Sequence, residues 1–558
     1  MPLKGFLRRV IEKRKINYPE FRIRIPKYFI NIPSFKDIEK VNVKYPLIEP
    51  LAYANIKWNP VQKELVYHVL EPVLSPKEKE DLEKIKNSLV KVIDIKLSDM
   101  KNEYKAIKYL EKNVKSILED LDLIVSPETY IKIMYYIFRD FIGLNEIEPL
   151  MHDPYIEDIG CDGLNTPIYI VHRKFGSIKT NIVYKDLDYL SNFVIKLSER
   201  CGRYISYSRP LLDGSLPDGS RVQATLAKDV TTKGPTFSIR RFRENPISPI
   251  ELINMGTVSP GIMAYLWTAV QYGSSMLICG GVATGKTTIL NCITMFIPPE
   301  QKIVSIEDTR ELNLPHENWI PAVSRMGFGI SEESKSYGEV NLFDLLKESF
   351  RQNPDYVIVG EVRGKEAYVM FQGIASGHPS IGTIHAGSMD DVMKRLSTPP
   401  IELSPSLIES LDLIVVMIHA REKGKSARRV KEIVEISSID PKTGMVHTVR
   451  PFFWIASIDS FEQKLMESNL IQKISREKGI PYEKLLKEIN MKARILEWMQ
   501  RHNITKFSDV SKIINLYYKG PETVIEWVEK DISPTELEVK RKIEEVGKTI
   551  TGLRVFKI

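Results

Sequence analysis

Cysteine is scarce in this sequence of 558 residues, and the sequence contains no long apolar run. The four cysteines form no C-x-x-C pair, so we expect neither a zinc ribbon nor a disulfide scaffold. The longest apolar run, residues 411–418, includes an aspartate and is far too short to cross a bilayer. The charges at Lys4, Arg8 and Arg9 are not followed by the apolar segment of a signal peptide. These absences argue against an integral membrane protein and a secreted protein, and we expect a cytoplasmic one.

Excess positive charge is confined to the N-terminal segment. The formal net charge is +7. Residues 1–50 hold 12 Lys and Arg against 5 Asp and Glu, whereas the remaining 508 residues hold 67 of each kind. This distribution indicates a local basic arm and argues against a protein-wide nucleic-acid surface. We therefore expect no specific nucleic-acid partner.

The pattern of prolines, glycines and apolar residues predicts five regions. In chain order they are a basic, proline-rich arm (1–75), an α+β domain (76–243), a linker (244–250), an α/β domain (251–450) and a helical region (451–558). In the α/β domain, short β-rich runs alternate mostly with helical ones, which is typical of a parallel sheet with crossover helices. The strands predicted there are 276–279, 303–306, 356–359, 381–384 and 413–418.

Local signals place further elements in the first two regions. Ser75 and Ser126, each followed by a proline, mark the starts of helices. The pairs 213–214 and 218–219, both Asp-Gly, are turn signals beside short strands. The arm lacks a sustained period and has seven prolines in its first 60 residues, so we expect it to be extended apart from one short helix at its start.

Residues 280–287, GGVATGKT, fit the phosphate-binding pattern G-x-x-x-x-G-K-[ST], and we call them the P-loop. Glycines at both ends let the backbone wrap a phosphate with its N–H groups, while Lys286 reaches the β- and γ-phosphates and the Thr287 hydroxyl ligates Mg²⁺. A strand over 275–279 and a helix over 288–296 flank the loop, which a chance glycine-rich turn would not require. The predicted cofactors are ATP and Mg²⁺. The predicted binding residues are Gly280, Gly281, Val282, Ala283, Thr284, Gly285, Lys286, Thr287 and Thr288.

Two glutamates end apolar strand patterns. Glu361 follows the run 356–359, and ligands in α/β sheets lie at such carboxyl ends. We predict that Glu361 holds Mg²⁺ together with Thr287, partly through water. Glu307 ends another buried strand pattern, and we predict that it orients or deprotonates the attacking water. The alternative for each is an ordinary carboxylate at a strand end.

Two histidines, His378 and His385, flank the strand-like run 381–384. Metal binding would require more ligands than the sequence offers near them. The functional interpretation of both is contact with the γ-phosphate of the nucleotide. A purely structural role is the alternative for each.

Four segments occur in the order typical of one family. They are the P-loop, IEDTREL (306–312), PDYVIVGEVRG (354–364) and SGHPSIGTIHAGS (376–388). This order resembles the Walker A, Asp box, Walker B and His box of the type II/type IV secretion superfamily ATPases. GLNEIEPL (143–150) and FSIRRF (237–242) resemble the family's N-terminal domain signature and its linker. The resemblance covers residues 100–440.

The resemblance implies an α/β fold in which a RecA-like P-loop domain with a parallel sheet follows an α+β N-terminal domain. It also implies a homohexameric ring with nucleotide between the two domains, where N-terminal arginines approach the γ-phosphate. Arg240 and Arg241 match the linker's basic cluster, and Arg221 lies in the preceding turn region. No acid cluster is evident beside these arginines, which favours a phosphate partner across an interface. Solvated arginines near a linker are the alternative.

Departures from the family pattern narrow the expected role. The sequence lacks the four-cysteine module of bacterial type II motors and the characteristic C-terminal helix of retraction motors, while residues 395–400 resemble the archaeal branch. We expect an ATPase that drives assembly of an archaeal type IV pilus-like filament, an archaellum or a type II-like pseudopilus, through a polytopic membrane platform protein. One alternative is a conjugation or type IV secretion ATPase moving protein or DNA, which predicts a shorter N-terminal region. Another is a nucleotide-regulated scaffold without turnover, which the intact acidic and P-loop residues disfavour.

The first 15 residues have the pattern of a short basic amphipathic helix. Apolar residues recur at helical spacing, and most basic residues fall off that stripe. We interpret residues 1–15 as docking on an acidic platform loop or on anionic lipid headgroups, which would associate the protein peripherally with the inner face of the cell membrane. The alternative is a helix that packs its apolar stripe on the N-terminal domain.

Overall fold

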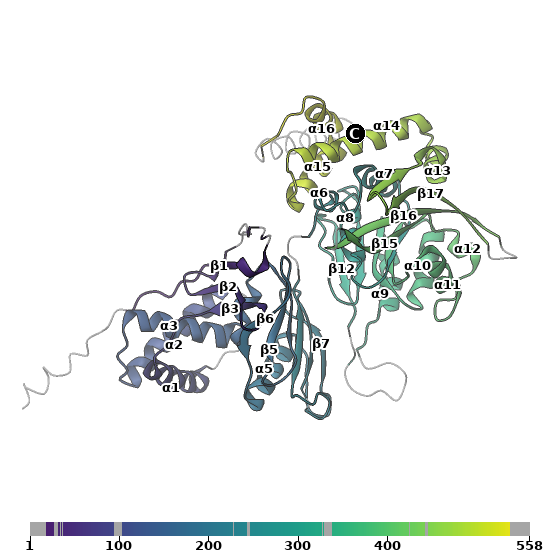
Figure 1. Ribbon diagram of the computed structural model, residues 1–558. Coiled ribbons are helices and arrows are strands. Elements are labelled where there is room, and N and C mark those ends of the chain that lie inside the picture. Colours follow the sequence, from purple (N-terminus) through teal and green to yellow (C-terminus); the bar gives the residue numbers. More distant parts are fainter. Residues whose placement is uncertain are drawn as a thin grey trace, which may run out of the picture. The chain divides into compact units, whose positions relative to one another are not determined.

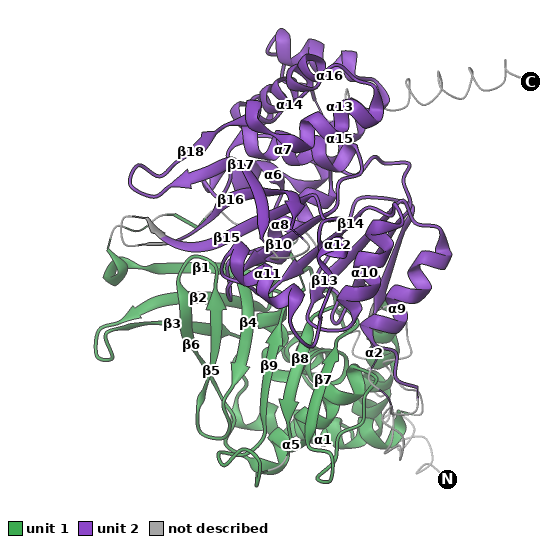
Figure 2. Ribbon diagram, turned by 90° about the vertical axis from the view of Figure 1, so that its right-hand side faces the viewer, with its two compact units in different colours: residues 1–242 green, residues 243–558 purple. Residues whose placement is uncertain are grey.

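The chain forms two compact units, residues 1–242 (unit 1) and 243–558 (unit 2), shown in Figures 1 and 2. The computed structural model describes residues 18–26, 32–33, 35, 37–93, 103–226, 228–242, 246–325, 327, 338–422, 425–440 and 445–535. The helix predicted within residues 1–15 lies outside these ranges. No helix in the described ranges is both long and apolar enough to cross a membrane.

The described strands of unit 1 form one nine-stranded sheet in the order β1-β2-β3-β6-β5-β4-β9-β8-β7. Neighbouring strands are antiparallel except β3 and β6, which are parallel. The strands are β1 (Asn42–Ile48), β2 (Ala52–Asn59), β3 (Glu64–Leu70), β4 (Ile156–Cys161), β5 (Pro167–His172), β6 (Gly176–Val183), β7 (Leu211–Ser215), β8 (Arg221–Thr225) and β9 (Thr236–Arg240).

The expectation of an extended arm through residue 75 is wrong for residues 42–70, which supply three strands of this sheet. In β2 the buried side chains alternate, but two of them are the alanines Ala52 and Ala54, which give a weak apolar signal. Pro46 is tolerated because β1 is the outermost strand, where a backbone donor is dispensable. The turn expected at 213–214 is also wrong, since both residues lie inside β7.

Unit 1 also contains five α-helices in its described residues. They are α1 (Pro76–Val92), α2 (Glu103–Asp120), α3 (Pro127–Ile137), α4 (Glu148–Met151) and α5 (Leu187–Arg200), with 3₁₀-helices at Ile38–Lys40 and Asn145–Ile147 and a π-helix at Phe138–Ile142. The two predicted helix starts are confirmed. Ser75 forms a capping box with Glu78, and the Ser126 hydroxyl accepts a hydrogen bond from the Thr129 N–H.

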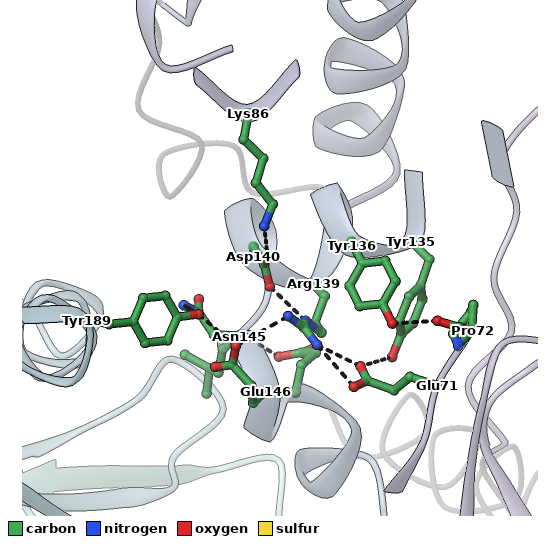
Figure 3. Close-up of polar contacts among 12 residues, drawn as sticks. Glu71, Pro72, Lys86, Tyr135, Tyr136, Arg139, Asp140, Asn145, Glu146 and Tyr189 are labelled. Carbon is green, nitrogen blue, oxygen red and sulfur yellow. Dashed lines mark hydrogen bonds and ion pairs between the residues drawn. The ribbon is translucent and has the colours of Figure 1, made fainter. Parts of the chain in front are cut away.

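A polar network around the buried Arg139 joins helices of unit 1 to the segment that follows β3 (Figure 3). The guanidinium lies 2.9 Å from Glu71, 2.7 Å from Asp140 and 3.4 Å from Glu146. Each carboxylate has a second partner. These partners are Tyr135 on Glu71, Lys86 on Asp140 and Tyr189 on Glu146. Because the three acids raise the pKa of Arg139 well above its usual value despite burial, the guanidinium stays charged and serves a structural role.

The described strands of unit 2 form a second sheet in the order β12-β11-β13-β14-β10-β15-β16-β17-β18. The first six are mutually parallel, and β16, β17 and β18 continue the sheet antiparallel. The strands are β10 (Met276–Gly280), β11 (Ile303–Glu307), β12 (Trp319–Val323), β13 (Tyr356–Val362), β14 (Ser380–Ile384), β15 (Leu413–Glu422), β16 (Lys425–Ile439), β17 (Val446–Ile455) and β18 (Ser460–Gln463). All five strands predicted in this region are confirmed. Their apolar runs are nearly continuous because helices cover both faces of a parallel sheet.

The core of unit 2 lies on both faces of this sheet. Met276 and Ile278 of β10 point into one apolar cluster with Trp267, whereas Leu277 and Cys279 point into the other. The helices are α6 (Pro249–Asn254), α7 (Pro260–Gln271), α8 (Lys286–Thr294), α9 (Leu342–Ser349), α10 (Glu366–Ala375), α11 (Met389–Ser397), α12 (Pro405–Ile408), α13 (Asn469–Lys478), α14 (Tyr482–Arg501), α15 (Phe507–Lys519) and α16 (Pro521–Glu529). The expectation that residues 451–558 are purely helical is wrong at its start, where β17 ends and β18 follows.

Candidate functional site

The P-loop connects the carboxyl end of β10 to the first residue of α8, Lys286. The predicted strand, loop and helix are therefore confirmed, with the helix beginning two residues earlier than expected. A Cβ atom at Gly280 would lie 2.8 Å from the Met417 carbonyl oxygen of β15, so glycine is required there. Ala283 and Gly285 have positive φ values of 58° and 92°. The side chain of Val282 is exposed.

Lys286 is buried beside the loop that precedes it. Its Nζ donates hydrogen bonds to the carbonyl oxygens of Gly280 at 3.0 Å and Gly281 at 2.9 Å. It also lies 3.2 Å from Nδ1 of His385. Burial lowers the pKa of Lys286. The ammonium is thus held by neutral acceptors, an arrangement that an anion can displace.

His385 bridges Lys286 and Glu361 at the carboxyl ends of β14 and β13. Its Nε2 lies 3.1 Å from Oε1 of Glu361. Burial and the charge of Lys286 lower the pKa of His385, so neutral imidazole accepts from Lys286 at Nδ1 and carries its proton on Nε2. Burial raises the pKa of Glu361, but the hydrogen bond and charge of Arg363, together with His385 and Lys286, outweigh burial and lower it. Glu361 is therefore a carboxylate at neutral pH.

Glu307 lies at the end of β11, adjacent to β13 in the sheet. Its side chain is buried, and Oε1 accepts hydrogen bonds from the N–H groups of Glu311 at 2.9 Å and Leu312 at 3.1 Å. Oε2 has no partner among the residues that the structure describes. Burial raises the pKa of Glu307 to about 7. Gly360 makes room for it, because a Cβ there would lie 3.0 Å from Cγ of Glu307.

Two threonines and two arginines complete the surroundings of the loop. Thr287 and Thr288 lie half-buried in the first turn of α8. Sequence reasoning gave no role to Arg363, although this residue belongs to the segment 354–364. Its guanidinium forms ion pairs with Glu361 and with Asp308, and the distance to Oδ2 of Asp308 is 3.4 Å. Sequence reasoning also missed Arg428 of β16, whose Nε donates to the Ala283 carbonyl oxygen at 2.9 Å. Arg428 stands outside every recognised motif, so no local signal marks it.

The structure does not bring His378 to this edge of the sheet. His378 precedes β14 and His385 follows it, so the whole of this five-residue strand, about 17 Å in length, lies between them. The ring of His378 packs edge-on against Phe350, with centroids 5.1 Å apart. The expectation that both histidines contact one γ-phosphate is wrong within this unit, because opposite ends of a strand lie at opposite edges of the sheet.

The three predicted arginines belong to unit 1, and each has a partner there. Arg240 lies 3.0 Å from Asp158, its cross-strand neighbour in β4, and Arg221 lies 3.1 Å from Asp213. Arg241 donates to the backbone carbonyl of Asp153. The expectation that no acid cluster lies beside these arginines misses single acids at Arg221 and Arg240. Strand pairing places Asp158 next to Arg240 although the two are 82 residues apart in the chain.

Comparisons with known proteins give consistent matches. The family model described as Type II/IV secretion system protein matches residues 168–450. The protein MJ0900 of Methanocaldococcus jannaschii is 34% identical over 543 residues, which span 92% of this chain and 96% of MJ0900. The type IV secretion system protein PtlH homolog of Bordetella bronchiseptica is 31% identical over 44% of this chain and 81% of its own length. The X-ray structure of the Legionella pneumophila ATPase DotB is 15% identical, covers 74% of this chain and 96% of DotB, and has a TM-score of 0.39.

Proposed function

Because the chain belongs to the type II/IV secretion system protein family, we propose that it is a motor ATPase that converts ATP and water to ADP and phosphate. Unit 2 would be its RecA-like catalytic domain. The observation that carries the proposal is the convergence of Lys286, His385 and Glu361 on the P-loop at the carboxyl edge of the unit 2 sheet. This is the edge at which α/β sheets bind ligands.

The P-loop residues fit a triphosphate. The close approach at Gly280 leaves no room for a side chain, and the loop leads directly into the N-terminus of α8, where the helix dipole favours an anion. Lys286 would exchange the neutral oxygens of Gly280 and Gly281 for phosphate oxygens. The Thr288 side chain lies in the same helical turn and would contact the phosphates from the helix side.

The Thr287 hydroxyl and the Glu361 carboxylate fit Mg²⁺, which prefers oxygen ligands and retains several waters. When bound, the ion would neutralise charge developing on the phosphate oxygens. Arg363 donates to Glu361 and would set the orientation of the carboxylate.

Glu307 would take the proton of the attacking water. Two backbone N–H groups hold Oε1, so Oε2 remains as the oxygen that can accept it. A pKa of about 7 suits a group that must gain and lose a proton near neutral pH. His385 would contact the γ-phosphate, linking it to Lys286 and Glu361.

We place the working protein in a homohexamer in which arginines of unit 1 act on a nucleotide. Arg240, Arg241 and Arg221 would have to exchange their local oxygen partners for phosphate. Where arginines act as fingers they contribute about 10³–10⁵ in rate. Arg240→Ala and Arg241→Ala should therefore be assayed separately across protein concentrations. Turnover that is unchanged in both variants and independent of concentration would exclude these two residues and the dependence on assembly.

The machine that best fits the whole chain is one that assembles an archaeal type IV pilus-like filament, archaellum or type II-like pseudopilus. In this role the protein would work in the cytoplasm against a polytopic membrane platform protein, with residues 1–15 docking on the platform or on anionic lipid. The similarity to PtlH favours a second candidate, a type IV secretion ATPase that moves protein or DNA. Disrupting the gene separates them, since the first role predicts loss of a surface filament and the second predicts loss of transfer.

The activity itself is tested with the purified full chain. We expect Mg²⁺-dependent release of phosphate from ATP by the natural protein and none by Lys286→Ala, because the phosphate contact is lost. Lys347→Ala, which changes an exposed lysine of α9, is the matched control and should retain the natural rate. Equal rates in Lys286→Ala and the natural protein would refute the assignment of the site.

A further inference from the structure

Side chains hold three carbonyl oxygens of the P-loop. Lys286 donates to Gly280 and Gly281, and the Thr284 hydroxyl also donates to Gly281 at 3.0 Å. The third carbonyl, that of Ala283, accepts from Nε of Arg428 at 2.9 Å. Lys286 and Thr284 belong to the loop itself, whereas Arg428 reaches it from 145 residues further along the chain. Arg428 is therefore an external support of the loop.

Arg428 lies beside the two loop residues whose backbone is left-handed. Ala283 has a φ of 58°, which is unfavourable for a residue with a side chain and persists only where neighbours enforce it. Gly285 has a φ of 92°, and Cδ of Arg428 lies 3.4 Å from the position that a Cβ of residue 285 would occupy. Nε of Arg428 thus holds Ala283 by a hydrogen bond, and Cδ of the same side chain lies beside Gly285.

The backbone that carries Arg428 is itself rigidly placed. Strand β16 pairs with β15, which pairs with β10, the strand that leads into the P-loop. The next residue, Arg429, is buried and lies 2.8 Å from Asp459. The N–H of Val430 donates to the Thr257 carbonyl oxygen at 2.8 Å. Packing of this kind orients a neighbouring side chain before any ligand arrives.

We propose that Arg428 is a positioning residue for phosphate binding, which acts by holding the Ala283 carbonyl through its Nε–H. This support matters when Lys286 exchanges the carbonyl oxygens of Gly280 and Gly281 for the nucleotide. Arg428 then still donates to the Ala283 carbonyl oxygen from outside the loop. The loop keeps its N–H groups turned toward the phosphates as a result. This inference rests on the proposed function of the P-loop in ATP hydrolysis.

Three substitutions of Arg428 distinguish the effect of its Nε–H donor from the effect of its positive charge. Arg428→Gln keeps an N–H donor at the same number of bonds from the backbone but removes the charge. Arg428→Met keeps a similar length without a donor, and Arg428→Lys keeps the charge but moves its nitrogen one atom further out. For Arg428→Met and Arg428→Lys we expect the KM for ATP to rise about three- to tenfold, as for a lost hydrogen bond, with a smaller change in kcat. Arg428→Gln should rescue the KM.

Two readouts decide the outcome. A natural KM in Arg428→Lys but not in Arg428→Gln would show that the positive charge of Arg428 interacts with the nucleotide. Natural KM values in all three variants would show that the contact has no effect on ATP binding. Either result overturns the proposal. Hydrogen exchange of residues 281–286 without nucleotide provides a test that does not depend on hydrolysis. Exchange should be faster in Arg428→Met than in Arg428→Gln, and equal rates contradict positioning even if the natural protein proves inactive on ATP. Arg450→Met, which removes an exposed arginine of β17, is the matched control.

Discussion

Arg139 of unit 1 and Lys286 of unit 2 are both buried cations, but their surroundings differ. Arg139 of unit 1 meets three carboxylates, which raise its pKa well above the usual value (Figure 3). Lys286 of unit 2 donates to two neutral carbonyl oxygens and lies beside a neutral imidazole, and burial lowers its pKa. A buried cation matched by acids completes the fold on its own, whereas one held by neutral acceptors is prepared for an anion that is not part of the chain.

Two acids, one in each unit, show the same contrast. Burial raises the pKa of Asp140 in unit 1, but Arg139 and Lys86 outweigh burial and lower it. Glu307 in unit 2 is buried and hydrogen-bonded to backbone N–H groups instead of cations, and there burial prevails and raises the pKa to about 7. Nearby cations therefore make Asp140 a fixed charge, whereas Glu307 can exchange protons near neutral pH.

The largest expected effect comes from breaking the network of unit 1. Arg139→Met removes a buried cation and leaves three half-buried carboxylates without their shared partner, so it should lower the free energy of unfolding by about 3–5 kcal/mol. Hydrogen exchange of β3 in increasing urea measures this loss within unit 1. Lys84→Ala, which removes an exposed ion pair with Glu80, is the control and should change little. Stability of Arg139→Met close to that of the natural protein would contradict the structural role of the network.

The second expected effect is a pH dependence of stability caused by Glu307. Its folded pKa of about 7 exceeds the usual 4.5, so folding favours the protonated form. The stabilisation is complete below pH 4.5 and is lost as the pH rises through 7, by about 3 kcal/mol in total. Glu307→Gln should therefore lose less stability between pH 5 and pH 8 than the natural protein loses.

Urea unfolding followed by tryptophan fluorescence measures this difference, because only Trp58 of the six tryptophans lies in unit 1. Parallel losses in the natural protein and Glu307→Gln would argue against the raised pKa. Hydrolysis should rise with pH through about 7 in the natural protein, since the base must be deprotonated, and Glu307→Gln should lack this rise.

The smallest expected effect concerns His385, which bridges Lys286 and Glu361. His385→Ala should lower kcat/KM about tenfold, the scale of one hydrogen bond to a charged group. His385→Asn retains an acceptor near the position of Nδ1, and His385→Gln retains a donor near the position of Nε2. Steady-state kinetics of the pair shows which contact matters, and natural rates in His385→Ala would remove the histidine from the site.

Local patterns predicted unit 2 well and unit 1 less well. The strands of the parallel sheet are continuous apolar runs, and the P-loop is a contiguous motif, so both are visible without knowledge of the fold. Strand β2 was missed because alanines occupy inward positions. The pairing of Asp158 with Arg240 depends on a register between strands that are far apart in sequence, and no local pattern encodes it.

The same reasoning explains the errors within the candidate site. His378 and His385 are seven positions apart and look equivalent in sequence, yet β14 carries them to opposite edges of the sheet. Arg428 reaches the P-loop only because β16 folds back beside β15. Chemistry concentrated in one segment was therefore predictable, whereas contacts made by tertiary folding were not.

The measurement that tests the central claim most directly is Mg²⁺-dependent ATP hydrolysis, together with nucleotide binding, by the natural protein and Glu361→Gln. The amide keeps the size of the side chain but removes the charge that would hold the metal ion and pair with Arg363. We predict that the variant binds ATP while its hydrolysis falls at least about 100-fold. Full hydrolysis by Glu361→Gln would contradict the assignment of this edge of unit 2 as the catalytic site.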